Sequence, residues 1–247
     1  MKIFSTDWVD EIPNNEYGGK ASNLGALSRG GMKVPPGFAL APDENPSMED
    51  VQFLIDSVCD GFPVAVRSSA IGEDGTGFSV AGQYDTILNL GTIEGVMKAI
   101  GSVRESAHNE RVESYQTEFA LEATGVGVVI QQMVRAISSG GMFTAEPVES
   151  DPDYIAIESV TGFGDKLGSG MASPDFHLVE KTTEAVVEST CINNPVLGRT
   201  ELKILTEAGK SIEKMYGCPQ DIEWAFGYTV GSNQALFILQ SRPITTV

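Results

Sequence analysis

The sequence predicts an α+β protein of two lobes, with mostly antiparallel sheets flanked by helices. Its 247 residues, 41% of them hydrophobic, suffice for one large domain or for two lobes. Helical and strand-like segments follow one another in an irregular order that does not fit a regular βαβ array. The segment 221–244 has the pattern of a β-hairpin, which joins antiparallel strands. We expect an N-terminal lobe over residues 1–120 and a C-terminal lobe over residues 121–247.

Apolar spacing and chain breakers place the individual elements. The helix expected over residues 48–58 has Val51, Leu54, Ile55 and Val58 on one side. The other helices are expected over residues 22–30, 93–120 and 201–216, the first and last ended by glycine or proline. Strands are expected over residues 63–67, 84–90, 125–134 and 154–159, from residue 141 onward, and in the terminal hairpin.

Charge and cysteine content exclude several classes of function. The net charge of −18 makes nucleic acid and anionic membrane surfaces poor partners. No apolar run is long enough to cross a bilayer, and the N-terminus does not resemble a signal peptide, so we expect a cytoplasmic protein. Cys59, Cys191 and Cys218 are odd in number and lack metal-ligand spacing, which predicts neither a zinc site nor a disulfide framework.

The terminal hairpin holds the first candidate site. Symmetric pairing about its turn sets Glu223 opposite Gln240 and Asp221 opposite Arg242. Because side chains alternate along a strand, Gln240 and Arg242 then point the same way. Two oxygen ligands beside a fixed cation suit a site for a metal and a polyphosphate. The alternative is a cross-strand polar pair at a sheet edge.

Two cations upstream are candidates for binding phosphate. Lys20 follows two glycines at an expected helix start, where it could reach a phosphate or could be an ordinary solvated lysine. Arg67 ends an expected strand and leads into a glycine-rich loop that contains Gly72, Gly75, Thr76 and Gly77. Such a loop either holds an anion with its backbone amides or is a surface loop with a salt-bridged arginine.

The strand end at Gln131, Met133 and Val134 could receive a flat heterocycle such as adenine. This requires free backbone N–H and C=O groups beside apolar side chains, and plain core is the alternative. The two histidines, His108 and His177, are expected to be solvated surface residues.

Seven motifs, in order, resemble the nucleotide-binding domain of the phosphoenolpyruvate synthase and pyruvate phosphate dikinase family. They lie at residues 18–24, 34–38, 64–70, 81–86, 140–144, 221–225 and 240–245. The resemblance spans nearly the whole chain and implies an ATP-grasp fold, in which two lobes clamp Mg-ATP.

The resemblance also implies roles for individual residues. Lys20 and Arg67 would bind the phosphates, Glu223 and Gln240 would hold Mg²⁺, and Arg242 would stabilise the phosphoryl group in flight. Residues Gln131, Met133 and Val134 would line the adenine site. Thr76 and the glycines around it would cover the phosphates.

The acceptor of the phosphate is not implied. Neither the family's phosphohistidine carrier domain nor its pyruvate-binding barrel is present in this sequence, and neither histidine lies in the carrier motif. We therefore expect an ATP-dependent phosphotransferase that transfers a phosphoryl or pyrophosphoryl group to a small molecule or to a histidine on a separate chain. The alternatives are an ATP-grasp ligase that forms an acyl phosphate and a nucleotide-binding subunit without turnover.

Overall fold

The chain forms two compact units in a computed structural model. The structure describes residues 1–5, 8–71, 86–105, 125–163, 173–192, 194–229 and 233–244. One unit comprises Met1–Arg29 and Val34–Met133, and the other comprises Gly30–Lys33 and Val134–Val247. The lobe boundary expected at residues 120 and 121 lies outside the described residues, and the strand that follows it belongs to the first unit.

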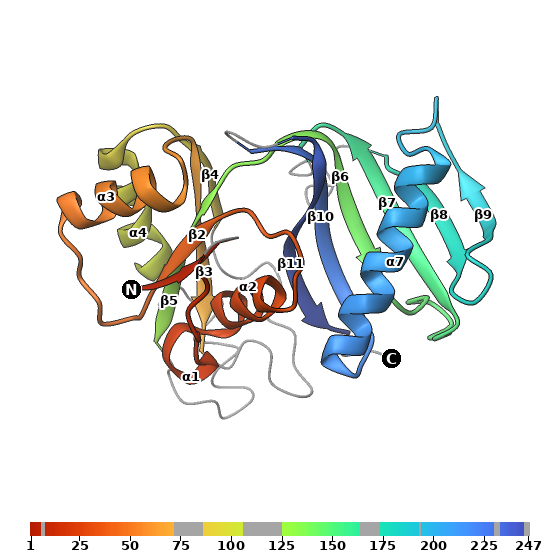
Figure 1. The fold of residues 1–247 in the computed structure, drawn as a ribbon, viewed down its shortest axis with the longest axis horizontal. Coiled ribbons are helices and arrows are strands. Elements are labelled where there is room, and N and C mark those ends of the chain that lie inside the picture. Colours follow the sequence, from red (N-terminus) through yellow and green to blue (C-terminus); the bar gives the residue numbers. More distant parts are fainter. Residues whose placement is uncertain are drawn as a thin grey trace. The chain divides into compact units, whose positions relative to one another are not determined.

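The first unit is a five-stranded antiparallel sheet with helices on both faces (Figure 1). The strands are β1 (Lys2–Phe4), β2 (Gly37–Leu40), β3 (Val64–Ala70), β4 (Thr86–Leu90) and β5 (Val126–Gln132), in the order β1-β2-β5-β3-β4. The helices are α1 (Asn14–Tyr17), α2 (Gly19–Arg29), α3 (Met48–Val58) and α4 (Ile93–Glu105).

Alternation along the strands gives the first sheet two different faces. Val64, Val66, Val128 and Ile130 belong to a buried apolar cluster with residues of α3 and α4. Their strand neighbours point to the opposite face. That face is the one against which α2 packs, through contacts with β3 and β5. One face of the sheet thus packs into an apolar core, and the other face carries polar residues and contacts α1 and α2.

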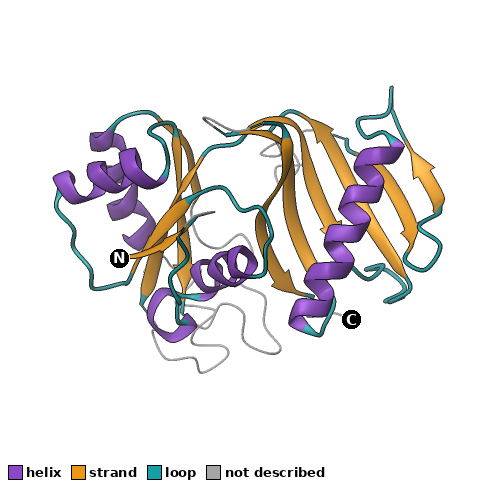
Figure 2. Ribbon diagram, viewed as in Figure 1, coloured by secondary structure: helices purple, strands orange, loops and turns teal. Residues whose placement is uncertain are grey.

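The second unit is a six-stranded antiparallel sheet crossed by one long helix (Figure 2). The strands are β6 (Arg135–Phe143), β7 (Tyr154–Thr161), β8 (Asp175–Glu180), β9 (Val186–Thr190), β10 (Gln220–Tyr228) and β11 (Ala235–Pro243). Their order is β11-β10-β6-β7-β8-β9, and the helix is α7 (Arg199–Tyr216).

Helix α7 packs on the sheet through one apolar stripe. Leu202, Leu205, Gly209 and Ile212 are buried and recur at helical spacing, while most charged residues of the helix lie on its other sides. Gly217 ends the helix in the left-handed conformation, at φ 72°, which glycine adopts without steric cost. The opposing sheet face contributes Ile222 and Trp224, both fully buried. This packing leaves the other face of β10 for polar side chains.

The structure confirms most of the expected elements. Helix α3 has the predicted bounds, 48–58, and its start is fixed by a capping box between Ser47 and Asp50. The prediction that the strand over residues 63–67 ends at Arg67 is wrong, because β3 continues to Ala70 by pairing with β5. Strands β8 and β9 were not predicted; β9 is an exposed edge strand without apolar alternation, and β8 is recognised only from its pairing with β7 and β9. Across the described ranges, the structure contains no helix long and apolar enough to span a membrane.

Two adjacent glycines of β6 provide a test of the second sheet. A Cβ on Gly140 would lie 1.8 Å from the Glu158 carbonyl oxygen, whereas a Cβ on Gly141 would meet no described atom within 4 Å. We expect Gly140→Ala to lower the free energy of unfolding by about 1–3 kcal/mol, the usual cost of overpacking. Gly141→Ala, the matched control, should change it by less than about 1 kcal/mol. Urea unfolding followed by circular dichroism measures both; equal losses would contradict the described register.

Candidate functional site

The terminal hairpin has the register that the sequence predicts. Glu223 lies opposite Gln240, and Asp221 lies opposite Arg242. Directly paired residues share a face of the sheet, so all four side chains project from the same side. Along β10, Asp221 and Glu223 alternate with Ile222 and Trp224, which are buried on the α7 side. The hairpin therefore presents a carboxylate, a carboxamide and an ion pair together on one face.

A β-bulge next to this row changes the pairing. Trp224 lies opposite Ile238, so Leu239 has no partner in the ladder. The extra residue turns Ile238 toward the buried side while Gln240 stays on the polar side. Regular alternation would have put residues 238 and 240 on the same face. Bulges are frequent beside functional sites because they redirect a side chain, which is their effect here.

Asp221 fixes the orientation of Arg242. The guanidinium donates two hydrogen bonds to one carboxylate oxygen of Asp221, from Nε at 2.9 Å and from Nη2 at 2.6 Å. Burial raises the pKa of the Asp221 carboxyl, and Arg242 opposes this shift without overcoming it. Two hydrogen bonds to one carboxylate oxygen fix the direction of the guanidinium, which suits a positioning contact. The hairpin register points to Asp221 as readily as to Glu223, although the predicted site omitted it.

The surroundings of Glu223 are open enough for a ligand. Glu223 is exposed, and its other strand neighbour is Gly141, which has no side chain. Among the described residues, no atom lies within 4 Å of the position of a Gly141 Cβ. A carboxylate and a carboxamide oxygen on adjacent strands are donors that Mg²⁺ accepts, and Mg²⁺ keeps other positions for water or phosphate. Glu223 and Gln240 therefore fit the metal that the resemblance implies.

The same face becomes apolar toward the other end of the hairpin. Val134, Ala225 and Phe237 form a small buried cluster, with Leu239 partly buried against it. The Lys33 ammonium lies 4.9 Å from the centre of the Phe237 ring, and the Lys33 carbonyl accepts a hydrogen bond from Ile238 N–H. One sheet face thus runs from an apolar end to a polar end, an arrangement that matches a base followed by phosphates.

In the first unit, close backbone packing brings the Lys20 motif against β3. A Cβ on Gly18 would lie 2.1 Å from the Ser69 carbonyl oxygen, so only glycine fits there. The Ser69 hydroxyl accepts a hydrogen bond from Ala21 N–H at 2.9 Å. Lys20 Nζ donates to the Ser68 carbonyl at 2.9 Å, and only 9% of Lys20 is exposed. The interpretation of Lys20 as an ordinary solvated lysine is therefore wrong, and Ser69, which the sequence did not single out, holds the motif in place.

Arg67 and Gln131 lie on the same face as this motif. Arg67 pairs with Val129 and Ala65 pairs with Gln131, and these residues alternate with the core residues of their strands. Arg67 lies inside β3, rather than at its end. Gln131 is buried, and its side-chain amide donates to the Pro35 carbonyl at 3.2 Å. Lys20, Arg67 and Gln131 are thus brought to the α2 side of the first sheet.

The strand end after Gln131 differs from the prediction in one respect. Met133 N–H donates to the Pro63 carbonyl at 3.1 Å, and Gln132 N–H donates to the Pro36 carbonyl at 2.8 Å. The expectation of free N–H groups is therefore wrong at these positions. The chain passes at this point from the first unit, which ends with Met133, to the second, which resumes with Val134.

Other predicted residues fall outside the site or outside the described part. Gly72, Gly75, Thr76 and Gly77 are not among the described residues, and neither is His108. His177 is only 3% exposed, so its prediction as a solvated surface histidine is wrong. It lies in β8, where burial of the ring lowers its pKa.

Comparison with known proteins now defines the family. Residues 46–196 and 189–247 match the family model described as pyruvate phosphate dikinase, AMP/ATP-binding domain. The chain belongs to this family. The family membership predicted from the sequence motifs is thereby confirmed.

Curated relatives carry several names. The chain is 29% identical to a probable phosphoenolpyruvate synthase of Methanocaldococcus jannaschii, over 97% of this chain and 26% of that protein. It is 31% identical to a probable phosphoenolpyruvate synthase of Methanothermobacter thermautotrophicus, over 93% of this chain and 44% of that protein. It is 30% identical to a rifampicin phosphotransferase of Streptomyces, over 97% and 35% respectively. The chain thus spans less than half the length of these relatives.

Solved structures agree on the fold. A dinucleotide-forming acetyl-coenzyme A synthetase of Ca. Korarchaeum cryptofilum matches with a TM-score of 0.51 and 13% identity, over 90% of each chain. D-alanyl-alanine synthetase A of Vibrio cholerae matches with a TM-score of 0.51 and 10% identity, over 93% of this chain and 55% of that one. At such identities the likeness concerns the fold alone, and it confirms the predicted ATP-grasp architecture.

The Asp221–Arg242 pair allows a test of how firmly the arginine is held. In a double-mutant cycle with Asp221→Asn and Arg242→Gln, we expect a coupling energy of about 1–2 kcal/mol, because both side chains are partly buried and joined by two hydrogen bonds. The exposed pair Lys203–Glu207, 3.8 Å apart, is the control and should couple by less than about 0.5 kcal/mol. Urea unfolding of the variants measures both energies. Equal coupling in the two pairs would show that Asp221 does not anchor Arg242.

Proposed function

We propose that the chain binds Mg-ATP and transfers a phosphoryl or pyrophosphoryl group to an acceptor. The observation that carries the proposal is the row on β10 and β11, where Glu223 and Gln240 stand beside an arginine held by Asp221. A guanidinium fixed by two hydrogen bonds beside two oxygen ligands offers the charge and geometry that a metal-bound phosphate requires. Family membership supports the nucleotide as the ligand.

Each residue then has a definite task in phosphoryl transfer. Glu223 and Gln240 would hold Mg²⁺, which when bound offsets the negative charge of the phosphate oxygens. Arg242 would place its guanidinium against the transferring group, where charge builds up in the transition state. The family resemblance assigns phosphate binding to Lys20 and Arg67 of the first unit as well. Positioning and charge neutralisation supply most of the catalysis in such reactions, so these groups suffice for the nucleotide half.

The apolar end of the same face is suited to the base. Val134 packs in a buried cluster with Ala225 and Phe237, and the latter two belong to the hairpin that carries the polar row. A flat heterocycle packs well against such side chains, while Gln131 and Met133 would contribute from the first unit. The acceptor would be a small molecule or a histidine carried by another chain or domain.

Nucleotide binding tests the metal ligands. We expect Glu223→Gln and Gln240→Ala each to weaken Mg²⁺-dependent ATP binding by about tenfold or more, equivalent to about 1.4 kcal/mol. Glu223→Gln removes the negative charge of one ligand, and Gln240→Ala removes the oxygen of the other. Neither variant changes the backbone groups that pair the strands. Glu188→Gln, an exposed carboxylate on β9 of the same sheet, should bind like the wild type. Isothermal titration with and without Mg²⁺ measures the effect, and unchanged affinity in both site variants would place the metal elsewhere.

Product analysis tests the class of reaction. With Mg-ATP and a competent acceptor, phosphorus NMR should show AMP for a pyrophosphoryl route or ADP with a phosphorylated product for a simple kinase. Arg242→Gln should slow product formation by about 10²-fold or more, with little change in ATP affinity, because its charge acts mainly in the transition state. ADP and free phosphate formed only when an acid and an amine are supplied together would contradict phosphotransfer and indicate a ligase.

A further inference from the structure

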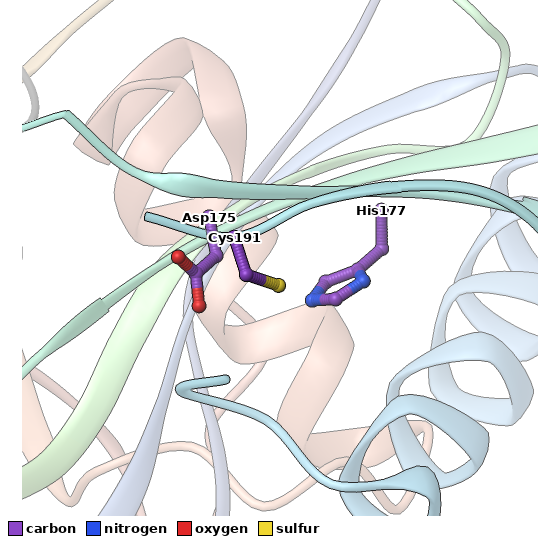
Figure 3. A group of neighbouring side chains, drawn as sticks. All are labelled: Asp175, His177 and Cys191. Atoms are coloured by element: carbon purple, nitrogen blue, oxygen red, sulfur yellow. The ribbon is translucent and has the colours of Figure 1, made fainter. Parts of the chain in front are cut away.

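A second group of metal-ligand side chains lies in β8 and the segment that follows β9. The side chains of Asp175, His177 and Cys191 each offer one ligand atom, and these atoms lie within 4.8 Å of one another. Figure 3 shows the three side chains next to one another, with the Cys191 sulfur and an edge of the His177 imidazole turned toward each other. Asp175 and His177 are almost fully buried, and Cys191 is partly exposed.

The register of the sheet produces this group. His177 pairs with Ser189, and the same ladder continued by two residues sets Cys191 opposite Asp175. His177 also pairs with Ile157, whose partner Met142 lies under Gly209 of α7. The group is therefore on the α7 side of the sheet, the side opposite to Glu223 and Gln240. It is separate from the proposed nucleotide site.

The imidazole is prepared to act as a ligand. Its Nδ1 lies 3.0 Å from the Ser189 hydroxyl, while its Nε2 is buried and has no hydrogen-bond partner among the described residues. A buried nitrogen without a partner is costly unless something binds it. With the proton on Nδ1, donated to Ser189, Nε2 carries a lone pair. Metal-binding histidines are typically oriented by such a bond from their other nitrogen.

The carboxylate and the thiol are held in a similar way. Asp175 accepts backbone hydrogen bonds from Ile192 at 3.2 Å and from Val196 at 2.8 Å, which fix its orientation and leave further lone pairs on both oxygens. Ser189 Oγ also lies 3.6 Å from Cys191 Sγ, so one hydroxyl touches two of the three groups. In known metal sites, hydrogen bonds of this kind to the ligand side chains hold those side chains in the orientation that binds the metal.

We propose that Asp175, His177 and Cys191 bind a zinc ion. One sulfur, one nitrogen and one oxygen ligand suit Zn²⁺ better than Mg²⁺ or Ca²⁺, which prefer oxygen alone. Tetrahedral zinc needs ligand atoms about 3.3–3.7 Å apart, given bond lengths of about 2.0–2.3 Å, so the side chains must close by about 1 Å. Binding releases the thiol proton of Cys191 to solvent. A water or another side chain takes the fourth position.

The site would join the edge of the sheet to the loop before α7. β9 is an exposed edge strand, and Cys191 lies just beyond it, while Asp175 accepts hydrogen bonds from the backbone N–H groups of Ile192 and Val196. A bound ion would link β8 to this segment with bonds stronger than hydrogen bonds. We expect its role to be structural, because the three ligands lie on the face that α7 covers.

Metal titration tests the proposal. The reduced, metal-free chain, without nucleotide, is titrated with Zn²⁺, and then with Co²⁺ as a spectroscopic probe. We expect one equivalent of zinc per chain and a Co²⁺ spectrum with tetrahedral bands and a thiolate charge-transfer band. Cys191→Ser should weaken binding by more than about 100-fold, and Ser189→Ala, which removes only an orienting contact, by about 10–100-fold. Cys218→Ser is the matched control, since Cys218 is also partly exposed, and should bind as the wild type does.

Two further measurements separate the site from its neighbours and from misfolding. Zinc should protect Cys191 from alkylation, read by mass spectrometry, while Cys218 in the same sample stays reactive. Glu223→Gln should keep its zinc affinity, which distinguishes this site from the nucleotide site. Circular dichroism of metal-free Cys191→Ser checks that the variant folds. The proposal is overturned if zinc does not bind at micromolar concentration, if Cys191→Ser and His177→Gln bind as the wild type does, or if the Co²⁺ spectrum lacks the thiolate band.

Discussion

The second unit depends on one constraint, the antiparallel register of β10 with its two neighbours. Pairing with β11 and β6 fixes which side chains of β10 point to α7 and which to the opposite face. A slip of one residue would expose Trp224 and bury Glu223 and Asp221. The large apolar core under α7 therefore enforces the polar row on the other side. Stability and the candidate chemistry are linked through the same hydrogen bonds.

On the side of the first sheet opposite to its apolar core, close backbone approach fixes helix α2 against β3. Gly18 lies directly against the Ser69 carbonyl, and the Ser69 hydroxyl receives Ala21 N–H. These contacts fix the start of α2 on β3, so that Lys20 and Arg67 lie on elements that pack directly against each other. The glycines of the first motif are thus required for packing before any ligand is considered.

Sequence patterns predicted the elements where local signals are strong. The helix 48–58 has a capping box and an apolar stripe, and both are local properties of its own residues. The hairpin register followed from the symmetry of two strands about one turn, and it holds at Glu223 and Gln240. The prediction did not include the bulge at Leu239, because the bulge responds to packing on both faces of the sheet. It also ended β3 too early, because Ser68 and Ser69 become strand only by pairing with β5.

The sequence by itself determined the family, the fold class and the types of residue available for a nucleotide and a metal. Those follow from ordered motifs and from patterns of a few neighbouring residues. The tertiary structure alone decided the burial of Lys20, the anchoring of Arg242 by Asp221, and the meeting of Asp175 and His177 with Cys191. Each of these depends on strand pairing or helix packing between segments that are separate in the chain. Local sequence carries no record of such contacts, because their energy arises only when the segments meet.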